Sequence, residues 1–447
     1  MKSRVNVMEG NETNVIIRLT IPMVYGLLSV IGVSLVDAFF IGKLGTQALA
    51  AFGFIFPIIF FFNGIILGIA NGASALSARA FGAGDKTKVR RITTDAIMLG
   101  FAITISLAVI TYLLIEPLFS ALGAPPDVMP LIREYMTIWL IGSPFVAFPM
   151  IGNNAMTAIG DTRNAANIML SVLVFNSLFD PVFIFGLGPI PALGFRGAAI
   201  ATLASRIFVI LAALHILVKK ENIIEFRQPS LNEIWTSWKE ILYIGLPNAL
   251  TNIILPLGFS VITHLAAQYG KEAVAALSVA ERVEALGLSI MMALSASMSP
   301  FIGQNLGAQN YDRIKTGLRK GLQLSAYWGV ILFVILFFFS EQIIRFFNHD
   351  PIVISHFKSY FHFLPFSYPF LGFMFITGTM LNVFKKPLHS AFLSVTRIFI
   401  AYVPLAFLFA AFFQVPGIFL AAMLANFIVA FLGYYLQVKY RKEVIGI

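Results

Sequence analysis

Two acidic residues lie in segments that are otherwise apolar enough to cross a membrane. Asp180 lies within FNSLFDPVFIF, residues 175–185, with Asn176 one helical turn before it, and Asp37 lies within GVSLVDAFFIG. A charged side chain in hydrocarbon costs at least about 2.5–3.5 kcal/mol, so such residues normally serve a function. Desolvated or adjacent carboxylates take up protons near neutral pH, and carboxylate, amide and hydroxyl oxygens also suit Na⁺. The sequence therefore predicts a site for H⁺ or Na⁺ and leaves both ions open.

Other polar residues fall in neighbouring apolar segments. Thr202, in GAAIATLAS, is expected to complete the ion-coupling set, and Asn153, Asn154 and Tyr135 are expected to form a hydrogen-bond network near it. The alternative for each is a hydrogen bond that only holds helices together. Pro181 directly follows Asp180 and predicts a kink, because proline interrupts the helical hydrogen-bond ladder.

The composition is that of a polytopic membrane protein. The chain is 58% hydrophobic and 12% charged, whereas soluble domains are about 25% charged. It has no cysteine, which excludes disulfides, thiolate metal sites and a cysteine nucleophile. No P-loop, paired catalytic motif or metal-ligand cluster is present, so we expect no enzyme activity and no cofactor beyond the coupling ion.

Twelve apolar stretches are each long enough to span the membrane as a helix. This predicts an all-α polytopic membrane protein with spans at about 15–41, 48–76, 93–115, 131–157, 166–187, 197–218, 241–268, 278–300, 320–340, 357–383, 391–412 and 417–437. The first is too long for a cleaved signal peptide and is read as a retained span. Most of the 31 Lys and Arg residues fall on one side if both termini are cytoplasmic, as the positive-inside rule requires. Three arginines fall within spans: Arg206, Arg282 and Arg397. Arg206 and Arg397 either neutralise acids or extend to the interface.

The chain also matches itself when it is shifted by 225 residues. LGTQALAAFG aligns with YGKEAVAALS, and FGAGDKTKVRR aligns with LGAQNYDRIKT. The repeat predicts an N-terminal six-helix lobe (1–218), a cytoplasmic linker (219–240) and a C-terminal six-helix lobe (241–447), related by a pseudo-twofold axis along the membrane normal. Two lobes of this kind are typical of a transporter that opens alternately to each side.

The two halves differ in their acids. Asp37 aligns with Ile262, and no Asp or Glu occurs between residues 351 and 442, so isolated acids deep in spans are expected in the first half alone. The C-terminal half instead carries Glu281, Arg282 and Glu284 in SVAERVEALG. These three form either a local ion pair at the outer interface or, with Met291, a substrate-facing or gating cluster.

Several of these motifs together resemble the MATE (multidrug and toxic compound extrusion) family. They are VSLVDAFFIGKLGTQALAA, GNNAMTAIGDTRNA and NSLFDPVFIFG, and ERVEALG resembles the prokaryotic branch related to the DNA-damage-inducible F protein (DinF). The resemblance implies that Asp37, Asn176 and Asp180, with Thr202, bind the coupling ion in exchange for an exported compound. A second acidic site known from the Vibrio NorM branch lacks its acids in the seventh and tenth spans here.

The predicted function is a cation-coupled antiporter, with H⁺ favoured over Na⁺, that exports amphipathic, often cationic, organic compounds. The alternative is a flippase for a lipid-linked precursor, against which the few intramembrane arginines argue. We expect a multi-pass protein of a prokaryotic plasma membrane, such as a bacterial inner membrane, that is functional as a monomer. Its expected partners are small-molecule substrates and the lipid bilayer, with no nucleic acid.

Overall fold

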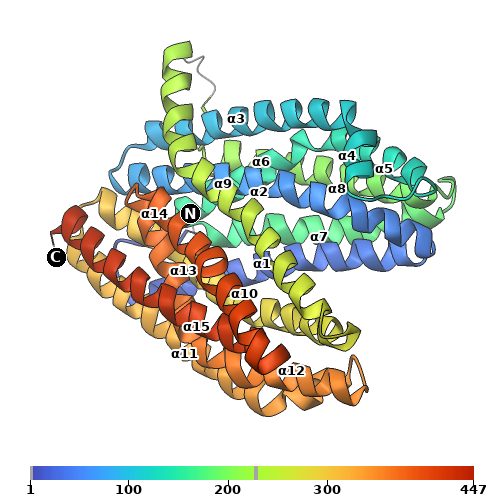
Figure 1. Cartoon of the computed structure of the whole chain (residues 1–447). Coiled ribbons are helices and arrows are strands. Elements are labelled where there is room, and N and C mark those ends of the chain that lie inside the picture. Colours follow the sequence, from blue (N-terminus) through green and yellow to red (C-terminus); the bar gives the residue numbers. More distant parts are fainter. Residues whose placement is uncertain (1–3, 226–229, 447) are drawn as a thin grey trace. The chain divides into compact units, whose positions relative to one another are not determined.

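The computed structural model describes residues 4–225 and 230–446, and helices dominate them (Figure 1). By contacts, the described residues separate into two compact units. The N-terminal unit comprises the described residues of Met1–Val5 and Pro22–Ala249, and the C-terminal unit comprises Asn6–Ile21 and the described residues of Leu250–Ile447. Of the linker predicted at 219–240, residues 226–229 lie outside the described residues.

The helices of the first half follow the predicted spans. They are α1 (Glu12–Gly42), α2 (Thr46–Gly82), α3 (Lys86–Leu113), α4 (Ile115–Ala121), α5 (Met129–Gly142), α6 (Pro144–Ala158), α7 (Thr162–Phe185), α8 (Gly194–His215) and the π-helix η1 (Ile216–Lys220). The fourth predicted span is divided between α5 and α6, which meet at an angle of 49°. Pro144 begins α6 directly after this bend, as expected of a residue that favours the first turn of a helix.

The second half contains α9 (Leu231–Ala267), α10 (Lys271–Gly307), α11 (Tyr311–Arg345), α12 (Pro351–Phe363), the 3₁₀ turn η2 (Leu364–Ser367), α13 (Tyr368–Val383), α14 (Pro387–Val395), the π-helix η3 (Thr396–Tyr402) and α15 (Val403–Ile445). The last two predicted spans fall in the continuous run from Pro387 to Ile445, but they are separated at Gln414, whose φ of 55° and ψ of −136° are not helical. A Cβ atom at Gly417 would overlap the carbonyl oxygen of Phe409. Two residues eight positions apart would lie about 12 Å apart in a straight helix, so the chain turns back here.

The described residues contain ten helices long and apolar enough to cross a membrane, or eleven if the bent pair α5 and α6 counts as one span. This number treats the run from Pro387 to Ile445 as one helix. Because the chain reverses at Gln414, that run supplies the eleventh and twelfth predicted spans. Large apolar side chains are exposed on both units, among them Leu35 and Phe431, as expected of helices that lie in a membrane.

The predicted repeat is confirmed by the backbone. α2 and α10 are each 37 residues long and begin 225 residues apart, directly after Gly45 and Gly270, which both have φ of 111°. The hydrophobic cores repeat with the same offset. Four buried residues of the N-terminal unit each have a buried counterpart 225 positions later: Val128 and Val353, Ile132 and Phe357, Tyr135 and Tyr360, Met136 and Phe361.

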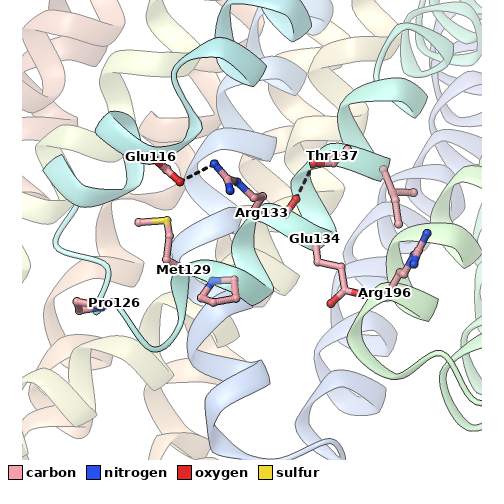
Figure 2. Close-up of a pocket in the computed structure, with 9 residues that line it drawn as sticks. Glu116, Pro126, Met129, Arg133, Glu134, Thr137 and Arg196 are labelled. Carbon is pink, nitrogen blue, oxygen red and sulfur yellow. Dashed lines mark hydrogen bonds and ion pairs between the residues drawn. The ribbon is translucent and has the colours of Figure 1, made fainter.

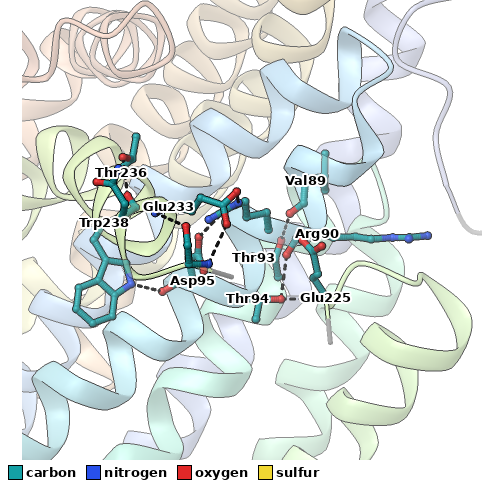
Figure 3. Close-up of polar contacts among 12 residues, drawn as sticks. Val89, Arg90, Thr93, Thr94, Asp95, Glu225, Glu233, Thr236 and Trp238 are labelled. Atoms are coloured by element: carbon teal, nitrogen blue, oxygen red, sulfur yellow. Dashed lines mark hydrogen bonds and ion pairs between the residues drawn. The ribbon is translucent and has the colours of Figure 1, made fainter. Parts of the chain in front are cut away.

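A polar network fixes the start of α9 to α3 within the N-terminal unit (Figure 3). The indole nitrogen of Trp238 donates a hydrogen bond to the carbonyl oxygen of Asp95 at 3.0 Å, and Arg91 pairs with Glu233 at 3.1 Å. The backbone nitrogen of Glu225 donates to Thr94 Oγ1 at 2.9 Å. These contacts hold the segment that connects the two halves against the cytoplasmic end predicted for α3.

Candidate functional site

The two predicted acids, Asp37 on α1 and Asp180 on α7, are neighbours in the N-terminal unit. The side chain of Asp37 interacts with those of Asp180 and Asn176. The amide nitrogen of Asn176 donates to Asp180 Oδ1 at 3.4 Å, and both of these residues are fully buried. The i, i+4 spacing therefore places the amide beside the carboxylate, as the sequence predicted.

Small residues on α1 allow it to lie close to α7. A Cβ atom added at Gly26 would lie 3.7 Å from the Cα of Ala166, and one added at Gly32 would lie 3.1 Å from the side chain of Leu173. Glycines at helix contacts let backbones approach closely, as is common between membrane helices. This packing brings the carboxylates of two different helices to one place.

The site has unused hydrogen-bonding capacity. Three buried oxygen atoms accept no hydrogen bond: Asp37 Oδ1, Asp180 Oδ2 and Asn176 Oδ1. A buried polar atom without a partner costs about 1–3 kcal/mol, and a charged one costs more. A proton or a small cation bound among these oxygens would remove that cost, so the arrangement is chemically suited to bind either one.

Tyr135 on α5 and Thr202 and Arg206 on α8 surround the acids. Tyr135 is buried and interacts with Thr202, Arg206 and both aspartates. Thr202 also donates to the carbonyl oxygen of Ala198 at 3.0 Å. Tyr135 and Thr202 therefore lie beside the two aspartates.

Arg206 interacts with Asp37, and its guanidinium carbon lies 5.3 Å from the ring of Trp139. The sequence had left open whether Arg206 neutralises an acid or extends to the interface. Arg206 lies four residues after Thr202 and therefore on the same helix face. This spacing favours the alternative in which Arg206 neutralises an acid.

The remaining predicted residues of this half are Asn153, Asn154 and Pro181, and among the described residues none of them forms a hydrogen bond with the acid pair. Asn154 on α6 donates to the carbonyl oxygen of Met150 at 3.0 Å, whereas Asn153 Oδ1 is buried without a hydrogen-bond partner. Within residues 4–225 and 230–446, neither asparagine makes a recorded contact with the two aspartates. Pro181 lies inside α7, which continues to Phe185.

The charged cluster of the C-terminal unit does not form the expected local ion pair. Arg282 is exposed, and no ion pair joins it to Glu281 or Glu284 among the residues that the structure describes. That reading was wrong because helix neighbours at i, i+1 and i, i+2 do not face each other. Glu284 instead accepts a hydrogen bond from the Tyr360 hydroxyl at 2.5 Å. Met291 is buried in the core of this unit.

A separate open pocket of about 550 Å³ lies where α4, α5 and the start of α8 meet (Figure 2). Arg133 and Glu116 pair across it at 2.5 Å, and Glu134 and Arg196 also line it. None of the residues predicted for ion coupling lines this pocket. Nothing in the sequence indicated this pocket, because its lining residues come from α4, α5, α8 and the turn before α5.

Comparisons with known proteins agree with this architecture. The MatE family model matches residues 22–182 and 247–408, two segments that begin 225 residues apart. The chain is 35% identical over 436 residues to a protein of Shewanella oneidensis named FAD transporter, covering 98% of this chain and 96% of that protein. It is 26% identical over 385 residues to a probable multidrug resistance protein NorM of Thermotoga maritima, covering 85% of this chain and 81% of that protein.

Among solved structures, the Vibrio cholerae MATE transporter VcmN in the bent form superposes with a TM-score of 0.92 at 28% identity, covering 97% of this chain and 98% of that one. The fold thus defines a polytopic membrane transporter with the twelve-helix MATE architecture. The chain belongs to the MatE family. It is therefore a transporter and not an enzyme, and its substrates are small molecules.

Proposed function

We propose that this protein is a proton-coupled antiporter that exports an organic compound from a bacterial cell. The observation that carries the proposal is the buried contact of Asp37 with Asp180 and Asn176, which leaves three oxygen acceptors without donors. Two carboxylates this close cannot both be ionised without a large electrostatic cost. Binding of one cation would relieve that cost, so ion binding and release would change the forces between α1 and α7.

The charges around the acids favour H⁺ over Na⁺. Arg206 interacts with Asp37, so the two ionised aspartates and the guanidinium together carry one net negative charge. One proton would neutralise the group. A sodium ion would be held by the same oxygens but repelled by the guanidinium, whose charge persists under physiological conditions.

We propose a flavin dinucleotide as the first substrate to test, because the Shewanella oneidensis relative is named FAD transporter. Amphipathic, often cationic, drugs are the second candidate, because several other relatives are named multidrug resistance proteins. The two candidates imply different coupling. A cationic drug would compete directly with the proton for the acids, whereas an anionic dinucleotide would respond to a change in helix arrangement that protonation favours.

In the proposed cycle, a proton enters the acid pair from the outside and favours release of the substrate there. Its later departure to the cytoplasm restores the negative charge and resets the site. Pro181 would let α7 bend between these states, because it removes one hydrogen bond of the helical ladder. The membrane topology proposed for this cycle places both termini in the cytoplasm, two lobes at 1–218 and 241–447, and one functional monomer. We also propose membership of the DinF-related branch, on the ERVEALG motif at 281–287.

The test uses purified full-length protein in liposomes loaded with FAD or, separately, with a cationic dye. Either a pH gradient or a Na⁺ gradient is imposed. We expect substrate movement under the pH gradient for the wild type and none for Asp180→Asn, while Glu116→Gln, a change at an exposed surface acid, behaves as the wild type. Movement under Na⁺ alone would overturn proton coupling. No movement of either substrate under either gradient would favour the flippase alternative.

A further inference from the structure

The C-terminal unit contains a half-buried polar cluster that is separate from the acid pair of the N-terminal unit. Glu284 on α10 accepts the hydroxyl hydrogen bond of Tyr360 on α12, and Arg397 and Tyr368 also interact with Glu284. Arg397 lies on the π-helix η3. Short π-helical segments occur frequently at functional sites, which favours a functional role for this cluster over a purely structural one.

The internal repeat places this cluster at the position that corresponds to the acid pair. Tyr135 and Tyr360 are equivalent under the 225-residue offset that relates α2 to α10. Both tyrosines are buried, with 1% and 4% of their surfaces exposed, and each one interacts with a carboxylate. The carboxylates themselves come from non-equivalent positions, which is why an alignment of acids between the two halves did not reveal a second site.

The charges of the cluster do not balance. Glu281 and Glu284 lie three residues apart on one face of α10 and interact electrostatically, as helix geometry requires. The two glutamates are faced by Tyr360 from α12, Tyr368 from α13, and Arg397 and Tyr402 from η3. Arg397 Nη1 also donates a hydrogen bond to Asn426 Oδ1 on α15 at 3.5 Å. Among the described residues, Arg397 is the one cation recorded against these acids. Two carboxylates and one guanidinium carry one excess negative charge.

The three tyrosines of the cluster are closely packed, whereas Glu281, Glu284 and Arg397 are half-buried. Tyr360, Tyr368 and Tyr402 are 4%, 0% and 8% exposed and belong to the apolar core of the unit. Arg397 Nε has no hydrogen-bond acceptor, and the Tyr368 hydroxyl is directed toward Glu284. Donors beside a carboxylate pair stabilise its ionised form, while the adjacency of the two carboxylates favours protonation of one of them, so the cluster is suited to exchange a proton.

We propose that Glu281 and Glu284 share one exchangeable proton and form a second proton site of the transporter, with Tyr360, Tyr368 and Arg397 as positioning residues. Protonation makes the cluster neutral, and deprotonation leaves a single negative charge that the tyrosine hydroxyls solvate. The proposal that this site binds a proton does not depend on the proposed antiport function. Its contribution to transport, a second proton moved per substrate, rests on the proposed antiport function.

The direct test is a titration of proton uptake by the purified full chain in detergent, carried out in the background Asp37→Asn/Asp180→Asn so that the first site is silent. We expect the further double change Glu281→Gln/Glu284→Gln to remove about one proton from the uptake near neutral pH. The control is Asp312→Asn, because Asp312 is an exposed acid of the same unit. Equal uptake in the cluster variant and the control would overturn the proposal.

A second variant guards against misfolding of the double mutant. Tyr360→Phe keeps both glutamates and removes the donor to Glu284, so it should shift the midpoint of the remaining uptake, whereas its repeat counterpart Tyr135→Phe should not in this background. An unchanged midpoint in Tyr360→Phe would contradict the proposal. In liposomes the ratio of protons to substrate should fall from two to one in Glu281→Gln/Glu284→Gln. If the wild-type protein transports no substrate in liposomes, the antiport function is refuted, and the titration still decides whether Glu281 and Glu284 bind a proton.

Discussion

At the scale of single residues, Asp37 and Asp180 differ from ordinary buried acids in what surrounds them. Structural buried acids satisfy their oxygens with donors, as Asp161 does when it accepts from the backbone nitrogen of Asn164 at 3.3 Å. Asp37 and Asp180 instead each leave one buried oxygen without a donor. This difference supports a role in exchange of a cation rather than in holding the fold.

The coupling acids should therefore tolerate neutral replacement structurally but not functionally. Asp37→Asn and Asp180→Asn should each abolish substrate export, because neither amide can bind and release a proton, while expression stays near the wild-type level. Asn176→Ala should weaken transport without abolishing it, since it removes one hydrogen bond worth about 0.5–1.5 kcal/mol. Resistance or efflux assays beside a membrane immunoblot check this. Normal export by both aspartate variants would contradict the account.

Glu221, which follows the last helix turn of the first half, provides a pH-dependent stability test outside the membrane spans. Burial raises the pKa of Glu221 above 4.5, although its ion pair with Arg4 acts in the opposite direction. An acid whose pKa is higher in the folded state stabilises the protein at pH values below its unfolded pKa, and that stabilisation is lost as the pH rises through the folded value. The melting temperature of the wild type minus that of Glu221→Gln should thus decrease from about pH 4.5 toward neutrality. A difference that grows with pH would show that the ion pair dominates.

At the scale of helices, the sequence predicted most spans because their apolar runs are long, and it predicted the contact between Asn176 and Asp180 because it is local. It could not predict that Arg206 faces Asp37 or that Glu284 meets Tyr360, because both depend on how separate helices pack. The bend between α5 and α6 was also missed. Pro144 lies inside an otherwise uninterrupted apolar run, and hydropathy alone does not distinguish a kink from a straight span.

Two glycines at the reversals before the last helix of each half offer a test at this scale. A Cβ atom at Gly197 would overlap the carbonyl oxygen of Phe183, and one at Gly417 would overlap that of Phe409. Gly197→Ala and Gly417→Ala should each destabilise the protein by about 1–3 kcal/mol, as expected for overpacking against backbone. The control Gly53→Ala lies in open space and should be neutral or slightly stabilising. Thermal unfolding in detergent distinguishes these outcomes, and equal melting temperatures for all three variants would contradict the predicted reversals.

At the scale of the whole molecule, the internal repeat was predicted correctly from the sequence, but its consequence for the C-terminal half was not. The 225-residue offset correctly related α2 to α10 and the buried residues near Tyr135 to those near Tyr360. It also led to the expectation that isolated acids deep in spans occur in the first half alone, and it gave no indication that the half-buried Glu284 is bonded to a buried tyrosine of the second half. The tyrosines lie at equivalent positions of the two halves, whereas the acids beside them lie on non-equivalent helices.

The most direct measurement of the central claim records proton flux and FAD flux together in liposomes containing the wild type or Asp180→Asn, under an imposed pH gradient without Na⁺. We predict that wild-type protein moves FAD against protons and that Asp180→Asn moves neither. FAD movement by Asp180→Asn that still follows the pH gradient would contradict the assignment of the coupling site to Asp37 and Asp180.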